Sequence, residues 1–110
     1  MKEYSIYNVD FGKGTGHEQS YSRPAIVFRL FHDINMCLTI PLTSNLDRLS
    51  LPYTSLINRT ATTSLTTDSV ALVFQLRAIA NARIIGNEIG TLDDQQVGKI
   101  KTILKDMLAL

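Results

Sequence analysis

The stretch at residues 36–42, Met-Cys-Leu-Thr-Ile-Pro-Leu, decides the fold class because its residues alternate in character. Four apolar side chains fall on one face of an extended chain: Met36, Leu38, Ile40 and Leu42. This period of two predicts a half-buried β-strand. Because proline has no backbone N–H, Pro41 predicts that the strand ends there or lies at a sheet edge.

Segments on both sides of this stretch also predict strands. They cover residues 5–11 and 24–31 before it, with a turn at 32–35, and residues 53–58, 69–79 and 83–85 after it. The residue types of 69–79 would also permit a helix. Residues 44–50 and 59–68 are polar and predict a loop and a surface turn.

The end of the chain predicts a helix. Thr91 with Asp94 three residues later fits a capping box. Apolar residues then recur at helical spacing: Val97, Ile100, Ile103, Leu104, Met107 and Leu108. Several short strands followed by one helix favour a mainly β fold, a small curved barrel of about six strands with a C-terminal α-helix packed against it.

Composition limits the classes of function. The chain has 110 residues, 45% hydrophobic and 19% charged, so we expect one globular domain spanning residues 1–110. The net charge of +1 does not indicate a nucleic-acid binder, so any site for a polyanion must be a local cluster. Cys37 is the only cysteine and fits a reducing compartment. Neither a signal peptide nor an apolar run of membrane-spanning length is evident, so we expect a cytoplasmic protein without a membrane partner.

The loop at residues 12–22 holds three of the six glycines and leads into the strand at 24–31. Ionisable and amide side chains crowd at its end, where His17, Glu18, Gln19 and Arg23 fall within seven residues. Such crowding beside an apolar strand indicates a functional loop.

Several blocks of the sequence resemble the MazF/PemK/Kid toxins, in family order and over almost the entire chain. They are Val9-Asp10-Phe11, Gly16-His17-Glu18-Gln19, Arg23-Pro24-Ala25, the run at 38–44, the Gln75-Leu76-Arg77-Ala78-Ile79 segment, and Ile89-Gly90-Thr91-Leu92 before a terminal helix. The resemblance implies an SH3-like barrel that forms a homodimer. It also implies the toxin of a type II toxin–antitoxin pair, an endoribonuclease that cleaves single-stranded RNA at short sequences.

The resemblance also implies partners and reaction conditions. Members of the family need no metal ion and no cofactor. A cognate antitoxin protein blocks the RNA groove, and DNA is contacted only indirectly, through the antitoxin. Cleavage proceeds by attack of the ribose 2′-hydroxyl on its own phosphate, so the protein must stabilise charge and move protons.

Three residues are the candidate catalytic groups. Arg23 stands in the Arg-Pro of the family's catalytic arginine, and its planar guanidinium can bind two phosphate oxygens at once. Thr43 opposes Leu42 in strand parity, so it can point away from the core, and it matches an essential family threonine. Glu18 recurs in the family as a proton-handling group, or it holds Arg23 in place.

The remaining candidates are RNA-binding residues: His17, Gln19, Ser44, Asn45, Gln75 and Arg77. His17 could also assist proton transfer, because histidine titrates near neutral pH. Gln75 and Arg77 would share one strand face by period two and could contact bases or phosphates.

The sequence departs from the family at Phe74, where many relatives carry the aspartate that Kid-type members use in catalysis. Parity assigns Phe74 to the packed apolar face of its strand. Two alternatives to a nuclease therefore stay open, a non-catalytic toxin-like protein and a gyrase-binding toxin. Gyrase-binding relatives use an aromatic residue near the chain end, whereas this chain ends Met-Leu-Ala-Leu and has no Trp.

Overall fold

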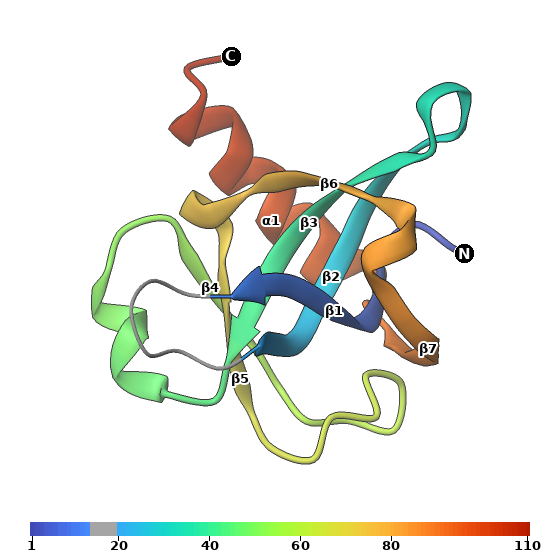
Figure 1. The fold of residues 1–110 in the computed structure, drawn as a ribbon. Helices are drawn as coiled ribbons and strands as arrows, with labels where there is room; N and C mark the ends of the chain where they lie inside the picture. The colour runs from blue at the N-terminus through green and yellow to red at the C-terminus, as the bar shows by residue number, and fades with distance from the viewer. Residues whose placement is uncertain (14–19) are drawn as a thin grey trace.

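A strongly bent sheet with one helix packed against it makes up the computed structural model, which describes residues 1–13 and 20–110 (Figure 1). The strands are β1 (Ser5–Lys13), β2 (Ser20–Phe31), β3 (Met36–Thr43), β4 (Thr54–Ile57), β5 (Ser69–Leu72), β6 (Arg77–Ala80) and β7 (Ile84–Thr91), and the helix is α1 (Asp94–Met107). Among the described residues the strand order is β4-β5-β3-β2-β1-β7, and β6 pairs with β3. The mainly β, curved half-barrel with a C-terminal helix is therefore confirmed.

Strand β3 is central to this arrangement because it pairs with three other strands. It pairs with β2 along most of its length, with β6 through Met36–Thr39, and with β5 through Leu42 and Thr43. Pro41 is buried and pairs with Ala25 of β2, so the expected strand end or sheet edge is wrong. Pro41 lies in the gap between the segments that pair with β6 and β5, where a missing N–H removes no bond to either strand.

The single strand expected at 69–79 is also wrong. The chain forms β5, then a turn of 3₁₀ helix, η3 (Val73–Gln75), and then β6. The break follows from the topology, because β5 and β6 pair with opposite ends of β3 and the chain must turn between them. Phe74 therefore does not lie on a packed face. Its side chain is 41% exposed, while the adjacent Val73 is fully buried.

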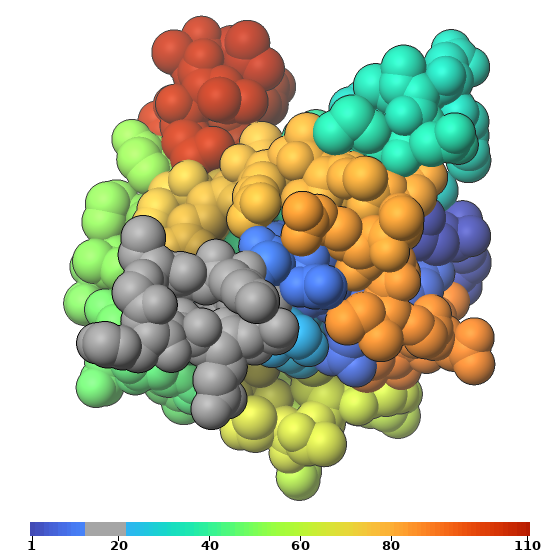
Figure 2. All heavy atoms as spheres, in the orientation of Figure 1, coloured from blue at the N-terminus to red at the C-terminus, as the bar shows by residue number. Residues whose placement is uncertain are grey.

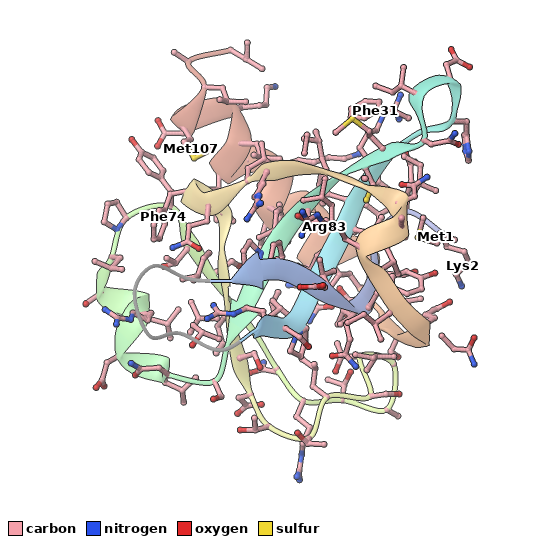
Figure 3. All side chains as sticks on the ribbon, viewed as in Figure 1. Met1, Lys2, Phe31, Phe74, Arg83 and Met107 are labelled. Atoms are coloured by element: carbon pink, nitrogen blue, oxygen red, sulfur yellow. The ribbon has the colours of Figure 1, made fainter. Side chains whose placement is uncertain are left out.

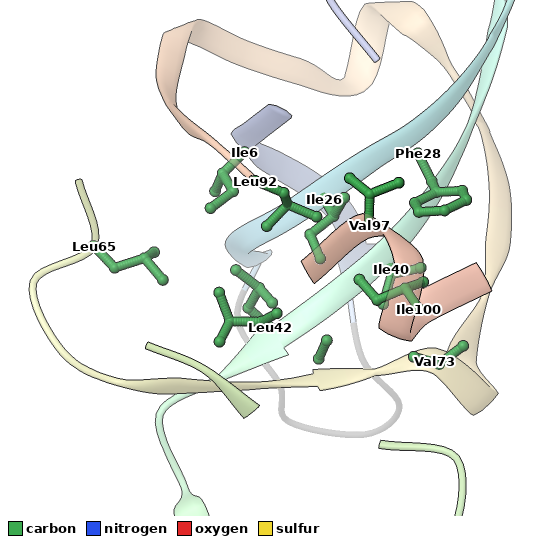
Figure 4. Close-up of a cluster of buried hydrophobic side chains, with 12 residues drawn as sticks. Ile6, Ile26, Phe28, Ile40, Leu42, Leu65, Val73, Leu92, Val97 and Ile100 are labelled. Atoms are coloured by element: carbon green, nitrogen blue, oxygen red, sulfur yellow. The ribbon is translucent and has the colours of Figure 1, made fainter. Parts of the chain in front are cut away.

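Helix α1 covers one side of the bent sheet, and the main hydrophobic core lies between them (Figure 4). Val97 and Ile100 of the helix pack with residues of β1, β2 and β3, among them Ile6, Ile26 and Ile40. These residues are 0–8% exposed. The helical spacing predicted from the sequence therefore describes the buried face of α1 correctly, although Leu108 is 50% exposed.

The start of α1 differs from the expected capping box. The N-cap is Asp93: its carboxylate accepts a hydrogen bond from the Gln96 N–H at 2.7 Å, and the Asp93 N–H donates to Gln96 Oε1 at 3.0 Å. Thr91 instead pairs with Ser5 in the sheet, and its N–H donates to the Thr62 carbonyl. Because the sheet holds Thr91 extended, the helix begins after it.

Other boundaries extend beyond the expected ones. Strand β2 begins at Ser20, so part of the expected loop is strand, and β7 continues to Thr91, well beyond the expected 83–85 segment. The polar segment after β3 contains a 3₁₀ helix, η2 (Leu46–Ser50). In the space-filling view the end of α1 and the turn at 32–35 project on the same side, with β6 between them (Figure 2).

Among the described residues, no helix combines the length and the apolar character needed to cross a membrane.

Candidate functional site

Arg23 and Thr43 come together where β2 and β3 pair. The β2–β3 pairing ends with Ala25 opposite Pro41, and Arg23 and Thr43 each lie two residues beyond this last pair on their strands. Both side chains are partly exposed, and both line the same two neighbouring pockets. Two of the three candidate catalytic residues therefore lie at one place, between the two pockets.

The first of these pockets, here called the hydroxyl pocket, has a volume of about 380 Å³. Its lining is rich in serine and threonine: Ser22, Arg23, Pro24, Leu42, Thr43, Ser44, Leu65, Thr66, Thr67 and Ser69. The strand ends of β2, β3 and β5 and the segment before β5 supply these residues. Hydroxyl groups both donate and accept hydrogen bonds, so this lining suits sugar and phosphate oxygens.

The second pocket, here called the arginine pocket, has a volume of about 440 Å³. It is lined by Arg23, Thr43, Asn45, Arg48, Leu51, Leu72, Phe74 and Gln75. Two arginines thus line one pocket. Within residues 1–13 and 20–110, no carboxylate forms an ion pair with Arg48. In a chain of net charge +1, this is the kind of local cluster that a polyanion site requires.

Short-range hydrogen bonds fix the segment that follows Thr43. The Asn45 N–H donates to Thr43 Oγ1 at 3.2 Å, and the Asp47 N–H donates to Asn45 Oδ1 at 3.1 Å. Asn45 is thereby the N-cap of η2, which carries Arg48. Since Thr43 Oγ1 accepts from the backbone, its own O–H remains able to donate to a bound oxygen. The Asn45 amide nitrogen likewise keeps two donors that the cap does not use.

The two polar residues expected on one strand face lie in different places. Gln75 belongs to η3 and lines the arginine pocket, whereas Arg77 begins β6. The Arg77 guanidinium lies over the Phe11 ring, 5.5 Å from its centroid, and the Arg77 carbonyl accepts from Thr39 Oγ1 at 3.0 Å. Arg77 is not among the residues that line either pocket.

Three sequence candidates, His17, Glu18 and Gln19, lie outside the described residues. Ser44 lines the hydroxyl pocket and Asn45 the arginine pocket, so these consecutive residues flank the Arg23–Thr43 pair on opposite sides. Sequence reasoning missed Arg48, which is the only basic residue between Thr43 and Asn58. That isolation was the available signal, although it does not reveal that Arg48 and Arg23 line the same pocket.

Metal ligands do not gather in the described part of the chain. No group of three or more His, Cys, Asp or Glu side chains there could hold a metal ion. The chemical groups present at the site are instead guanidinium, hydroxyl and amide groups, which bind anions and sugar oxygens.

Comparison with known proteins gives a family match over nearly the whole chain. Residues 2–108 match the family of PemK-like, MazF-like toxins of type II toxin–antitoxin systems. No curated protein matches the sequence.

Solved structures share the fold at low sequence identity. The chain is similar to MazF from Deinococcus radiodurans, with a TM-score of 0.77 and 18% identity over 100% of this chain and 97% of that one. It is also similar to an endoribonuclease in complex with its cognate antitoxin from a Mycobacterial species, with a TM-score of 0.74 and 17% identity over 98% and 94% of the two chains. A third similar structure is the Mycobacterium tuberculosis toxin MazF-mt6, with a TM-score of 0.73 and 16% identity over 96% and 97%.

Proposed function

The chain belongs to the PemK-like, MazF-like toxins of type II toxin–antitoxin systems, and from this premise we propose that it is an endoribonuclease acting on single-stranded RNA without a metal ion. The observation that carries the proposal is the position of Arg23 and Thr43 at the junction of two pockets, one rich in hydroxyls and one with a second arginine. If a backbone phosphate lies at this junction, the same RNA strand can continue from it into both pockets.

The reaction needs little from the protein beyond placement and charge. The ribose 2′-oxygen attacks phosphorus, the new O2′–P bond forms, and the P–O5′ bond breaks. Negative charge builds on the phosphoryl oxygens, and the Arg23 guanidinium stabilises it through two parallel N–H donors. The Thr43 O–H donates to the same phosphate and helps align it for in-line attack.

Two protons must also move. A base removes the proton of the 2′-hydroxyl, and an acid protonates the leaving 5′-oxygen. We assign this work to Glu18, with His17 as an assisting group, and we assign substrate contacts to Gln19, Ser44, Asn45, Gln75 and Arg77. The products would be a 2′,3′-cyclic phosphate and a 5′-hydroxyl.

The proposed partners follow from the same family. Two of the similar structures hold a toxin with its antitoxin, the mycobacterial endoribonuclease and MazE–MazF of Deinococcus radiodurans. We propose that this chain likewise binds a cognate antitoxin, forms a homodimer, contacts DNA only through the antitoxin, and acts in the cytoplasm, where messenger RNA is translated.

The decisive experiment incubates purified protein with a long mixed-sequence RNA in EDTA and maps the new ends. We expect cuts with 5′-hydroxyl and cyclic phosphate ends, and no cut where the attacking 2′-hydroxyl is replaced by hydrogen. A protein that leaves RNA intact would indicate a non-catalytic or protein-directed toxin. A cut that persists at a 2′-deoxy sugar would overturn the proposed nucleophile.

The role of Arg23 is tested by Arg23→Ala, which should slow cleavage about 10²- to 10³-fold with little change in fold. Arg23→Lys should recover only part of this loss, because lysine has charge but no paired donors. Arg29→Ala is the matched control: Arg29 lies further along the same strand, 3.6 Å from Glu3, and its side chain is 60% exposed. Equal activity of Arg23→Ala and Arg29→Ala would contradict the assignment.

A further inference from the structure

An apolar surface adjoins the arginine pocket, and the proposed reaction does not use it. It is lined by Leu51, Pro52, Tyr53 and Phe74, here called the apolar shelf, around a hollow of about 240 Å³. Leu51, Tyr53 and Phe74 are 37%, 38% and 41% exposed. Two aromatic rings at this exposure, on neighbouring segments, are a substantial apolar surface for a chain of 110 residues.

Backbone contacts hold the two aromatic residues in place. The Phe74 N–H donates to the Tyr53 carbonyl at 3.2 Å, just beyond Thr54 and Leu72, where the β4–β5 pairing ends. Thr54 Oγ1 donates to the Leu51 carbonyl at 3.0 Å and closes the turn between them. Tyr53 has a φ of 58°, in the left-handed region that a tyrosine rarely adopts. The surrounding structure therefore holds the Tyr53 backbone in a conformation that it would rarely adopt by itself.

The apolar shelf is continuous with the arginine pocket, because Leu51 and Phe74 line both. In Figure 3 Phe74 lies on the left of the view, on the other side from Met1 and Lys2. The pocket that Arg23 and Arg48 line thus adjoins the apolar shelf. A nucleotide has the same two parts, an anionic phosphate and a base with an apolar face.

We propose that the apolar shelf binds a base of the RNA substrate by stacking on Phe74, next to the phosphate that Arg23 contacts. The inference rests on the proposed function and adds to it a base subsite and a specificity-determining residue. Tyr53 and Pro52 form the walls that limit which base fits. Phe74 contacts the base and not the reacting atoms, so it sets RNA affinity and the preferred sequence rather than the rate of the chemical step.

Continuity with two arginines favours RNA over a protein segment as the occupant. An apolar peptide side chain would gain from the shelf alone, whereas a nucleotide uses the shelf and the guanidinium groups together. RNA bases that are recognised in single strands are commonly splayed out and stacked on aromatic side chains.

The first test measures single-turnover cleavage against RNA concentration for wild type, Phe74→Ala and Phe74→Trp. Phe74→Ala should raise the half-saturating RNA concentration about 5- to 100-fold with a much smaller change in the maximal rate. Phe74→Trp keeps an aromatic face and should stay within about threefold of wild type. Ile34→Ala is the control, since Ile34 is 63% exposed in the turn after Phe31, which lies at the opposite corner from Phe74 (Figure 3).

The second test locates the base. Abasic sugars are placed one at a time on each side of the cleaved bond. One position should weaken wild-type cleavage as much as Phe74→Ala does, and the same abasic RNA should cause no further loss in Phe74→Ala. Equal, additive losses at every position in both proteins would overturn the stacking assignment.

The third test separates binding from catalysis. The chain has no tryptophan, so Phe74→Trp introduces a single fluorescent reporter on the shelf. A mixed-sequence 2′-O-methyl RNA, which cannot be cut, should quench this fluorescence in a salt-dependent way. Quenching without cleavage of ordinary RNA would support the base subsite while the nuclease proposal fails. A half-saturating RNA concentration that Phe74→Ala leaves at the wild-type value would overturn the subsite alone, as would loss of antitoxin binding with RNA affinity unchanged.

Discussion

The hydroxyl of Thr43 shows how a single residue is prepared for binding. Its oxygen already accepts the Asn45 N–H, so the side chain is held in one orientation with its proton directed elsewhere. The neighbouring Leu42 is 3% exposed, and this anchors the strand end from the other face. A threonine hydroxyl with a pKa far above neutral is a poor base, so we assign Thr43 a hydrogen bond to the phosphate.

We predict that Thr43→Val, which has nearly the same shape without the hydroxyl, slows single-turnover cleavage about 10²-fold, because one hydrogen-bond donor to the phosphate is lost. Thr43→Ser keeps the hydroxyl and should retain most of the activity. Circular dichroism and thermal melting serve as folding controls for both. If Thr43→Val cleaves as fast as Thr43→Ser, the hydroxyl is not part of the mechanism.

At the scale of elements, the buried face of α1 and its first turn depend on different interactions. Apolar contacts fix its buried face, while its start depends on the reciprocal Asp93–Gln96 hydrogen bonds. These bonds satisfy two backbone N–H groups that the helix itself leaves without partners. Asp94 lies inside the first turn, where its charge interacts only with the helix dipole.

We therefore predict that Asp93→Ala lowers the free energy of unfolding by about 1 kcal/mol, measured by urea denaturation. Asp94→Ala should lower it by about 0.5 kcal/mol, because only the dipole term is lost. The order of these two variants distinguishes the observed cap from the one expected at Thr91. A larger loss for Asp94→Ala would mean that the helix begins in the other register in solution.

The elements also show which features the sequence could predict. Alternation identified β3 and helical spacing identified α1, because each pattern reflects burial of one face. The same alternation joined β5 to β6 across η3, since a single turn of 3₁₀ helix leaves no signal in a period of two. The capping frame at Thr91 and Asp94 was the one expected, and the pairing of Thr91 with Ser5, which is distant in the sequence, excludes it.

The candidate site was predictable only in part, for a similar reason. Arg23 and Thr43 were identified by motif, and both line the same two pockets just beyond the last β2–β3 pair. Arg48 lies in η2, and the shelf residues Leu51, Pro52 and Tyr53 lie in the turn after it. The placement of this segment depends on contacts such as that of Asn45 with Thr43. The exposure of Phe74 follows from η3, so parity along an assumed strand could not reveal it.

At the scale of the whole molecule, the surface keeps more apolar area than one small barrel requires. Large apolar side chains away from the shelf are exposed on several segments: Leu56, Ile85 and Leu108, at 41–50%. A net charge of +1 leaves little repulsion between copies of the chain. These features favour self-association, and a twofold dimer is its commonest closed form.

We predict that light scattering at micromolar concentration gives about twice the 12.3 kDa mass of the chain. High salt should leave the dimer intact, because apolar burial is not screened, whereas RNA affinity should fall as salt displaces the few phosphate contacts. Measuring mass and RNA binding across the same salt series separates the two surfaces. A monomer at every salt concentration, with RNA cleavage retained, would show that the exposed apolar residues serve another purpose and that one chain carries a complete site.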